Sequence, residues 1–486
     1  MRYKQVVRER QQRTTTSDRS LWWLLFLIGL ALSLLMVSRT RFDGDQFNML
    51  ARGWTLAFAG EWLQYGMPTS AGGMSPGGLQ SLLVGLPLMV WADGRAATLL
   101  LWLMSVVGYL LLDRTFGPAL GPRGRLLLAL CYWLNPWRMH YTSMLWNSSY
   151  MFFFGAVHAF CAVYMRRGRR FWPSLVMVLC VGLGLELHTA ALALAFASVL
   201  LWWRGVIRVS WWGVAAGSAL VVASVVPWMA VVAARPDLLP GGPGFPFRNL
   251  VLVQPFLRGL MYLLRYPSLA LPSRVYDLDL VRDGSADDTL FSALQVILVG
   301  LGWITVLLPV VAYRRFLRGP RVLWRRQPTE VGHRQWLHRY VFWTLAGAVV
   351  AFAISPTSVM FWQGFPVFHV AVLPVVLFVQ AVLRSGRVVA GRRAVAAVVG
   401  TVLAVNVLIG WASPMFRPSG PLRSGGSGTE ASFVRRLWAD HPMFHDLGLH
   451  ERCGLVVVGQ GGWMPDLWRE RQTGRGSGAG EGPHDQ

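Results

Sequence analysis

Two carboxylates one residue apart follow the first long apolar segment of the sequence. They lie in the run 41–48, which reads RFDGDQFN, so the two acids are Asp43 and Asp45. A carboxylate at a bilayer surface can act as a general base toward a hydroxyl group. Asp45 is equally well placed to cap a helix that begins at Gln46. The pattern alone leaves a catalytic and a structural interpretation open.

A second group of polar and aromatic side chains lies in the run 135–147. It contains Trp137, Arg138, His140 and Trp146. The forked arginine side chain matches the oxygens of a phosphate, so this group could hold an anionic head group. The alternative is an aromatic belt with a snorkelling arginine, which is common at membrane interfaces.

An acid and a histidine, Glu186 and His188, end another apolar run. Ionisable groups at such a depth are costly and usually face a cavity or a partner, which makes this pair a functional candidate. A structural hydrogen bond between helices is the other explanation. His369, near the end of a later run, is a weaker candidate. Four arginines of the segment 234–290 could also reach a phosphate: Arg248, Arg258, Arg265 and Arg274.

Metal and nucleotide chemistry have little support. His441, His445 and His450 are close in sequence, but Pro442 disrupts a helical pair and no cysteine or second cluster joins them. Walker loops, dinucleotide fingerprints, hydrolase elbows and zinc-protease signatures are absent. The sequence supports no cofactor, and a divalent metal is compatible with the acids but has no further support.

The elements that must position these residues are membrane helices. Of the 486 residues, 54% are hydrophobic and only 14% are charged, whereas soluble proteins carry about 25% charged residues. This composition excludes a soluble enzyme. The net charge of +23 comes almost wholly from arginines that cluster between apolar runs. Such clusters are typical of cytoplasmic loops rather than of a nucleic-acid groove.

The apolar runs predict an all-α polytopic membrane protein. Twelve runs approach the length of a span: 21–38, 79–92, 96–112, 124–137, 146–165, 172–187, 190–203, 211–233, 291–313, 339–355, 366–384 and 393–411. If 79–92 is re-entrant, the dense arginine clusters all face the cytoplasm. We therefore expect about 11 transmembrane helices, with the N-terminus inside and the C-terminus outside.

This topology predicts three regions along the chain. Residues 1–20 form a basic cytoplasmic N-terminus, and 21–411 form the transmembrane domain, whose outer loops are 39–95 and 234–290. Residues 412–486 form an extracytoplasmic region whose end, about 473–486, has a disordered composition. Within the first loop, an amphipathic stretch spans 47–58, and the Gly- and Pro-rich section 66–78 cannot be a regular helix.

The order of these features resembles the GT-C superfamily of integral membrane glycosyltransferases. It is most similar to the bacterial relatives of protein O-mannosyltransferases and of the aminoarabinose transferase that modifies lipid A. The resemblance covers residues 20–410. It rests on five segments in sequence order: FDGDQ at 42–46, AGEW at 59–62, SPGGL at 75–79, NPW to WN at 135–147, and ELH at 186–188.

The resemblance implies transfer of a sugar from a polyprenyl-phosphate carrier to an acceptor hydroxyl on the outer face of the membrane. An acidic residue in the first outer loop acts at the catalytic centre of the family. By position that residue is Asp45, and Gln46 stands where a glutamate is common, so the base is Asp45 or Asp43. We expect Arg138, His140 and His188 to bind the donor phosphate. Supporting roles fall to Glu186, Gln46, Trp137 and His369.

Two other classes of function stay open. A lipid-linked sugar flippase or other transporter would also be polytopic and basic, but it should carry charges along a path through the membrane. A noncatalytic membrane scaffold would tolerate loss of both acids. The near absence of lysine indicates a bacterium with a GC-rich genome, which implies the cytoplasmic (inner) membrane and undecaprenyl phosphate as carrier. The acceptor could be a lipid, a glycan or a protein.

Overall fold

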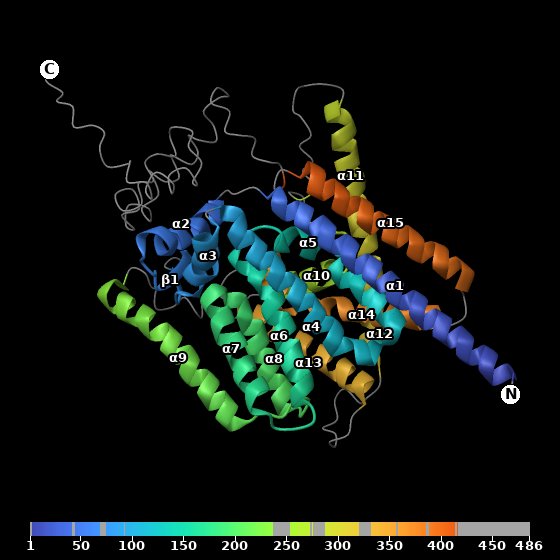
Figure 1. Cartoon of the computed structure of the whole chain (residues 1–486), viewed down its shortest axis with the longest axis horizontal. Coiled ribbons are helices and arrows are strands. Elements are labelled where there is room, and N and C mark those ends of the chain that lie inside the picture. Colours follow the sequence, from blue (N-terminus) through green and yellow to red (C-terminus); the bar gives the residue numbers. More distant parts are fainter. Residues whose placement is uncertain are drawn as a thin grey trace.

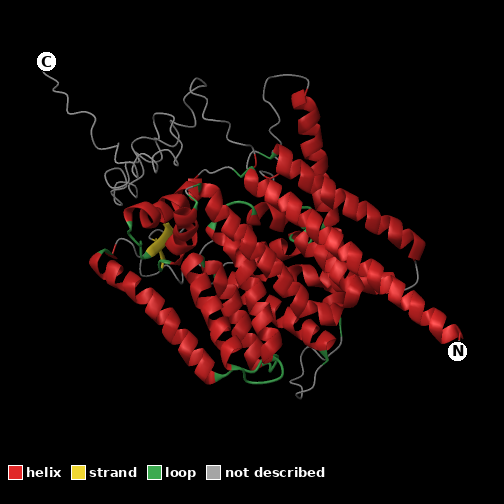
Figure 2. Cartoon of the chain, in the orientation of Figure 1, coloured by secondary structure: helices red, strands yellow, loops and turns green. Residues whose placement is uncertain are grey.

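The computed structural model shows a bundle of helices (Figures 1 and 2). It describes residues 2–416, with eleven residues or segments left out: 41–43, 69–73, 92, 237–252, 273–274, 276–286, 320–331, 356–357, 385–387 and 414–415 within that range, and 417–486 after it. Asp43, Arg248, Arg274 and the three histidines of the C-terminal tail therefore lie outside the described residues, as does nearly all of the region 412–486.

The chain has an all-α, polytopic membrane architecture, as predicted. Six described helical segments are long and apolar enough to cross a membrane: Asp18–Ser38, Gly94–Trp133, Asn147–Met165, Trp211–Ala234, Ser292–Leu317 and Phe361–Arg384. Four shorter apolar helices accompany them: Leu79–Val90, Phe171–Leu187, Thr189–Trp203 and Ala396–Ala412.

Several helices surround a central group. In sequence order the α-helices up to the middle of the chain are α1 (Arg2–Ser38), α2 (Gly44–Ala59), α3 (Leu79–Val90), α4 (Gly94–Leu128), α5 (Pro136–Thr142), α6 (Met151–Met165), α7 (Phe171–Leu187), α8 (Leu192–Trp203) and α9 (Trp211–Ala234). Those that follow are α10 (Val253–Arg265), α11 (Asp287–Thr305), α12 (Leu307–Leu317), α13 (His333–Ala353), α14 (Phe368–Arg384) and α15 (Val388–Ala412). Figure 1 shows α4, α6, α7, α8 and α13 at the centre, with α9 along one side and α1 and α15 along the other.

The helices are interrupted at glycine, asparagine and proline residues. Gly121, inside α4, has a φ of 69°, a left-handed conformation that glycine adopts without the usual steric cost. It separates the two apolar runs that we expected as two spans. Asn135 accepts a hydrogen bond from the backbone N–H of Trp137 and so caps α5, and Pro136 occupies the first helical position.

The segment 39–95, which we expected as the first outer loop, folds into a small unit beside the bundle. α2 and α3 pack on each other, and between them the strands β1 (Tyr65–Pro68) and β2 (Met74–Pro76) pair antiparallel. As expected from its glycine and proline content, the section 66–78 is not helical. α3 has 12 residues and is about 18 Å long, which is short for a hydrocarbon core of about 30 Å.

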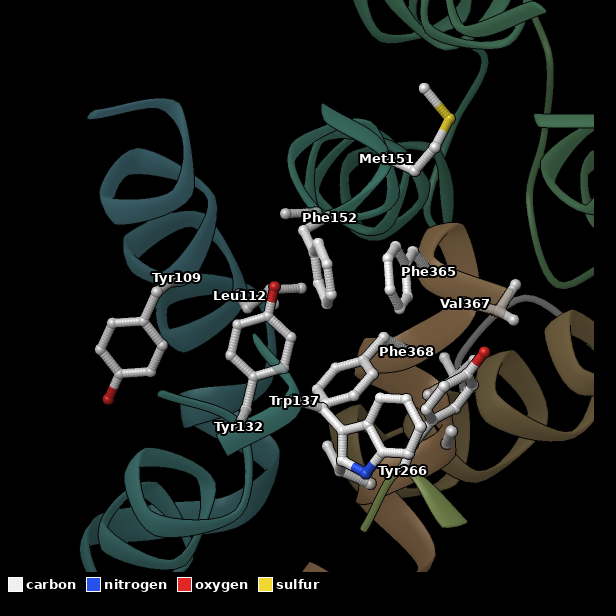
Figure 3. Packing of buried hydrophobic residues seen from close by; sticks show 14 of the residues in the cluster. Tyr109, Leu112, Tyr132, Trp137, Met151, Phe152, Tyr266, Phe365, Val367 and Phe368 are labelled. Carbon is white, nitrogen blue, oxygen red and sulfur yellow. The ribbon is translucent and has the colours of Figure 1, made fainter. Parts of the chain in front are cut away.

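Within the largely aliphatic core, aromatic side chains from helices that are distant in sequence pack on one another (Figure 3). Phe152 of α6 stacks on Phe365 at a ring distance of 4.5 Å, and Tyr132 meets Phe368 edge-on at 5.6 Å. Tyr266, which follows α10, packs against Phe368 at 5.2 Å. Phe152 also meets Phe368 of α14 at 5.1 Å, so these contacts join α6 to α14 and to the segment that precedes it.

Candidate functional site

Asp45 lies in the first turn of α2, where a negative charge is favourable to the helix dipole. Its side chain is exposed. The indole N–H of Trp146 donates a hydrogen bond to Oδ2 of Asp45 at 3.0 Å. Oδ1 has no hydrogen-bond partner in the described part of the chain. The structure thus brings together Asp45 and the 135–147 segment, which the sequence singled out separately. Oδ2 of the carboxylate accepts a hydrogen bond, and Oδ1 is left to accept another.

Three aromatic rings pack against the indole of Trp146. Its ring meets Trp362 at 5.2 Å, Tyr141 at 5.9 Å and Phe361 at 6.1 Å. Trp362 and Phe361 belong to the 3-10 helix η8 (Phe361–Val367), which precedes α14. Aromatic pairs at these separations are each favourable beyond simple burial. These ring contacts hold the indole in place independently of its hydrogen bond to the carboxylate.

Asn147 connects this pair to the end of α7. Its Nδ2 donates to the backbone carbonyl of Leu187 at 3.2 Å. The next residue, His188, caps the 3-10 helix η3 (Thr189–Ala191), because its Nδ1 accepts from the backbone N–H of Ala190 at 3.0 Å. When Nδ1 accepts, the proton of the neutral ring is on Nε2. His188 is half-buried, so it offers a donor at the same end of the bundle as Asp45.

Glu186 is buried and holds three elements together. Its Oε1 accepts a hydrogen bond from the Ser224 hydroxyl of α9 at 2.5 Å, and the backbone N–H of Leu79 at the start of α3 also bonds its carboxylate. Gly77 lies directly beside it: a Cβ at Gly77 would stand 2.1 Å from Glu186 Oε2. Glu186 is thus a structural junction between α3, α7 and α9, next to the SPGGL segment.

Arg52 of α2 points into the unit formed by α2, α3 and the two strands, which the sequence did not predict. It is fully buried, donates to the carbonyl of Tyr65 at 3.3 Å and lies over the Tyr65 ring at 5.2 Å. Burial lowers the pKa of Arg52 to about 10, so the side chain is still a cation at neutral pH. Gln46, the neighbour of Asp45, is also buried. A lone arginine in an amphipathic run gave no signal that it would point inward.

Arg138 lies in the core rather than at the surface. Its Nη1 donates to the Ser105 hydroxyl at 2.8 Å, and its guanidinium lies 3.9 Å from the centre of the Trp133 ring. Nε and Nη2 have no hydrogen-bond partner in the described part of the chain. Burial lowers its pKa to about 9. Arg138 therefore has no exposed surface, and it does not meet Asp45.

His140 and Trp137 are also buried, on other faces of α5. The His140 ring meets Tyr141 and Phe416 edge-on at 4.6 and 5.2 Å, and burial lowers its pKa to about 3. Trp137 packs edge-on against Tyr266 at 5.4 Å. The alternative of an interfacial belt with a snorkelling arginine is therefore wrong for Trp137 and Arg138.

His369 belongs to a buried network that the sequence did not reveal. Its Nε2 bonds the Tyr340 hydroxyl at 3.1 Å, which also bonds Nδ1 of His158 at 3.1 Å. Nε2 of His158 in turn bonds the Ser198 hydroxyl at 3.0 Å. This series of hydrogen bonds connects α6, α8, α13 and α14 in the core, and it does not reach Asp45.

Arg258 of the 234–290 segment contacts the residue that precedes η8. Its Nη1 contacts the thioether sulfur of Met360 at 3.7 Å, and Met360 directly precedes η8, which carries the rings around Trp146. Sulfur is a weak acceptor. The ion pairs of the described residues are Arg95 with Asp93 and Arg125 with Asp113, so Arg258 has no carboxylate partner there.

Within the ranges that the structure describes, no group of three or more His, Cys, Asp or Glu side chains is placed to hold a metal ion. What the site does contain is one open carboxylate, one imidazole donor and one half-buried guanidinium.

Comparisons with known proteins identify neither a family nor an activity. No family model matches the chain, and no curated protein matches it. Among solved structures, ArnT from Cupriavidus metallidurans in the apo state is similar, with 12% sequence identity and a TM-score of 0.36. The match covers 74% of this chain and 78% of that one. A similarity of that size leaves the function to be inferred from the site.

Proposed function

We propose that the protein is a membrane glycosyltransferase in which Asp45 is the general base. It moves a sugar from a polyprenyl-phosphate carrier to an acceptor hydroxyl. The observation that carries the proposal is the hydrogen bond between Trp146 and Asp45. It brings the first outer loop onto the 135–147 segment, whose Asn147 bonds the end of α7. Two hydrogen bonds therefore connect three of the five segments that carry the family resemblance: Trp146 bonds Asp45, and its neighbour Asn147 bonds Leu187.

The reaction is a single displacement at the anomeric carbon. Oδ1 of Asp45 accepts the proton of the acceptor hydroxyl, whose oxygen forms the new bond to the anomeric carbon. The bond from that carbon to the phosphate oxygen breaks, and its electron pair stays on the lipid phosphate. Attack comes from the face opposite the phosphate, so the configuration inverts. A phosphate monoester is a good leaving group, so no strong acid is required.

The growing negative charge of the phosphate needs positive or donor groups near the site. We assign this role to Nε2 of His188 and to the guanidinium of Arg258, because both lie at the Asp45 end and neither is fully buried. Arg138 and His140 were expected to share it, but both are buried among aromatic rings. We propose that they stabilise the fold around α5 instead.

A transfer assay on the full-length protein tests the proposal. Membranes containing wild type, Asp45→Asn or the control Asp18→Asn receive radiolabelled polyprenyl-phosphate sugars and an extract of envelope acceptors. Loss of a general base lowers the rate about 100-fold or more, so Asp45→Asn should lose transfer while still binding the labelled lipid. Asp18 lies at the other end of the first span, and its variant should match wild type.

The opposite result would favour another class of function. If Asp45→Asn transfers sugar at the wild-type rate, Asp45 only stabilises the start of α2. If wild type moves labelled lipid across vesicles without transferring sugar to any acceptor, the transporter interpretation replaces the transferase. Loss of lipid binding in Asp45→Asn would assign the residue to recognition rather than to proton transfer.

A further inference from the structure

Arginine-rich segments that are far apart in sequence meet at the end of the bundle opposite Asp45. α6 runs from Met151, near Trp146, to Met165, and α7 returns from Phe171 to the ELH segment. The link 166–170 therefore lies about 20 Å from the Asp45 end. Arg166 bonds His333 through Nη2 and Nε2 at 3.0 Å, and Arg339 donates to the carbonyl of Arg204 at 2.7 Å.

The link is held rigidly by its backbone. Arg170 forms a parallel bridge with Val209, and the backbone N–H of Arg208 donates to the carbonyl of Met165 at 2.8 Å. Ser174 accepts a further hydrogen bond from the backbone N–H of Ser210 at 2.9 Å. These bonds fix the ends of α6, α7 and α9 relative to one another. The arginine side chains of the link therefore project from a backbone that is held in place.

A pocket of about 430 Å³ opens beside this link, a volume that suits a small ligand. Four arginines and a histidine line it: Arg114, Arg166, Arg167, Arg170 and His333. No acidic side chain lines it, and the two ion pairs of the described residues lie elsewhere. Burial and the charges of Arg166 and Arg167 lower the pKa of His333. Among the residues that the structure describes, positive charge is therefore concentrated there without a carboxylate partner.

The rest of the lining is mostly apolar. Pro118, Phe160 and Val163 form an apolar wall, and Thr115 and Tyr164 complete the lining. Exposed tryptophans surround this end of the bundle: Trp172, Trp203 and Trp212 are 70%, 59% and 82% exposed. Tryptophan gathers at the level of lipid head groups. The pocket therefore lies where phosphates meet acyl chains, with a cationic side and an apolar side.

We propose that this pocket binds the phosphate of an anionic phospholipid head group, with Arg114 and Arg167 as its outer clamps. Guanidinium forks match phosphate oxygens in geometry and charge, and basic pockets at membrane surfaces bind anionic lipids. The apolar wall receives the start of the acyl chains. This site is separate from the Asp45 end and does not depend on the proposed transferase activity.

Native mass spectrometry of the full-length protein in detergent tests the proposal. Wild type and Arg114→Gln/Arg167→Gln are titrated with phosphatidylglycerol, with phosphatidylcholine and with inorganic phosphate at equal ionic strength. We expect wild type to retain phosphatidylglycerol in preference to phosphatidylcholine. Each arginine removed should weaken retention about fivefold. Both arginines are exposed, and thermal melting in phosphatidylcholine checks that the variant is folded.

A matched variant separates the pocket from general surface charge. Arg314→Gln/Arg384→Gln removes two exposed arginines near the ends of α12 and α14, outside the pocket, and it should retain the lipid like wild type. Equal loss in both double variants, or equal retention in all three proteins, would overturn the proposal. If inorganic phosphate displaces the lipid at equal concentration, the site takes a soluble anion and the lipid assignment is wrong.

Discussion

Single residues decide the chemistry of the Asp45 end. The carboxylate and the indole that contact each other are 101 positions apart, and each could be singled out by type, but their contact could not be predicted. Nor could spacing show that Arg138 faces Trp133 while Tyr141 faces Trp146. The side chains of a seven-residue helix point in all directions around its axis. Which of them are buried therefore depends on the elements that pack around the helix.

Removing the indole N–H should slow the reaction without unfolding the protein. A hydrogen bond to a charged group is worth about 1.5–3 kcal/mol, so Trp146→Phe should lower kcat about tenfold to 100-fold with little change in KM. Trp172→Phe, at an exposed position near the other end of the bundle, serves as the control. Equal rates in the two variants would show that the indole does not orient Asp45.

Gly77 should tolerate no side chain. Its φ is +81°, and a Cβ would stand 2.1 Å from Glu186 Oε2. Gly205 has a similar φ of +65° but nothing within 4 Å. Gly205→Ala should cost about 1–2 kcal/mol through backbone strain alone. Gly77→Ala should cost clearly more. Thermal melting of both purified variants measures the difference, and equal melting temperatures would exclude the clash.

His140 should make the fold sensitive to acid. In the folded protein its pKa is about 3, whereas an unfolded histidine takes up a proton near pH 6.5. The unfolded state therefore binds more protons below pH 6.5, and stability falls as the pH falls from 6.5 toward 3. At pH 5 the loss is about 2 kcal/mol. Denaturant unfolding at pH 7 and pH 5 should show a smaller pH effect in His140→Leu than in wild type.

At the scale of elements, the apolar runs predicted the helices well but not their joints. The expected runs 96–112 and 124–137 both lie on helical segments, and Gly121 breaks the helix between them, since its left-handed φ needs glycine. The run 291–313 is interrupted at Val306, between α11 and α12. Hydropathy measures how apolar a window is. It carries no information on where a tertiary contact interrupts the helix.

The cap of α5 should matter more than an ordinary surface cap. Asn135 accepts from the Trp137 N–H and donates to the carbonyls of Cys131 and Tyr266 at 2.9 and 2.8 Å. Asn135→Ala removes all three bonds and leaves buried partners unsatisfied, at a cost of about 2–4 kcal/mol. Thermal melting should fall accordingly. Asn135→Ser, which keeps a capping acceptor but loses both amide donations, should fall between this variant and wild type.

For the whole molecule, composition alone excluded a soluble protein and predicted a helical membrane bundle. The arginine clusters 166–170 and 204–208 meet at one end, together with 333–339, because α6, α7 and α8 alternate between the two ends. Charge counting cannot show that such a cluster encloses a pocket, since the pocket depends on backbone bonds between segments that are distant in sequence.

The arginine-rich end should face the cytoplasm, since basic loops are retained there. Thr189 at the Asp45 end and Arg167 at the other end are both exposed. In spheroplasts, a membrane-impermeant maleimide should label Thr189→Cys directly and Arg167→Cys only after permeabilisation. Cys161 and Cys180 are buried, and the unsubstituted protein gives the background. The reverse labelling pattern would place the Asp45 end inside the cell.

The contact between Gly77 and Glu186 also restricts how related chains can evolve. Position 77 can gain a side chain only where position 186 has first become small, and the left-handed backbone then admits little beyond asparagine. The reverse order passes through a destabilised intermediate. Substitutions at the two positions should therefore arise in a fixed order among relatives, with the change at 186 preceding the change at 77.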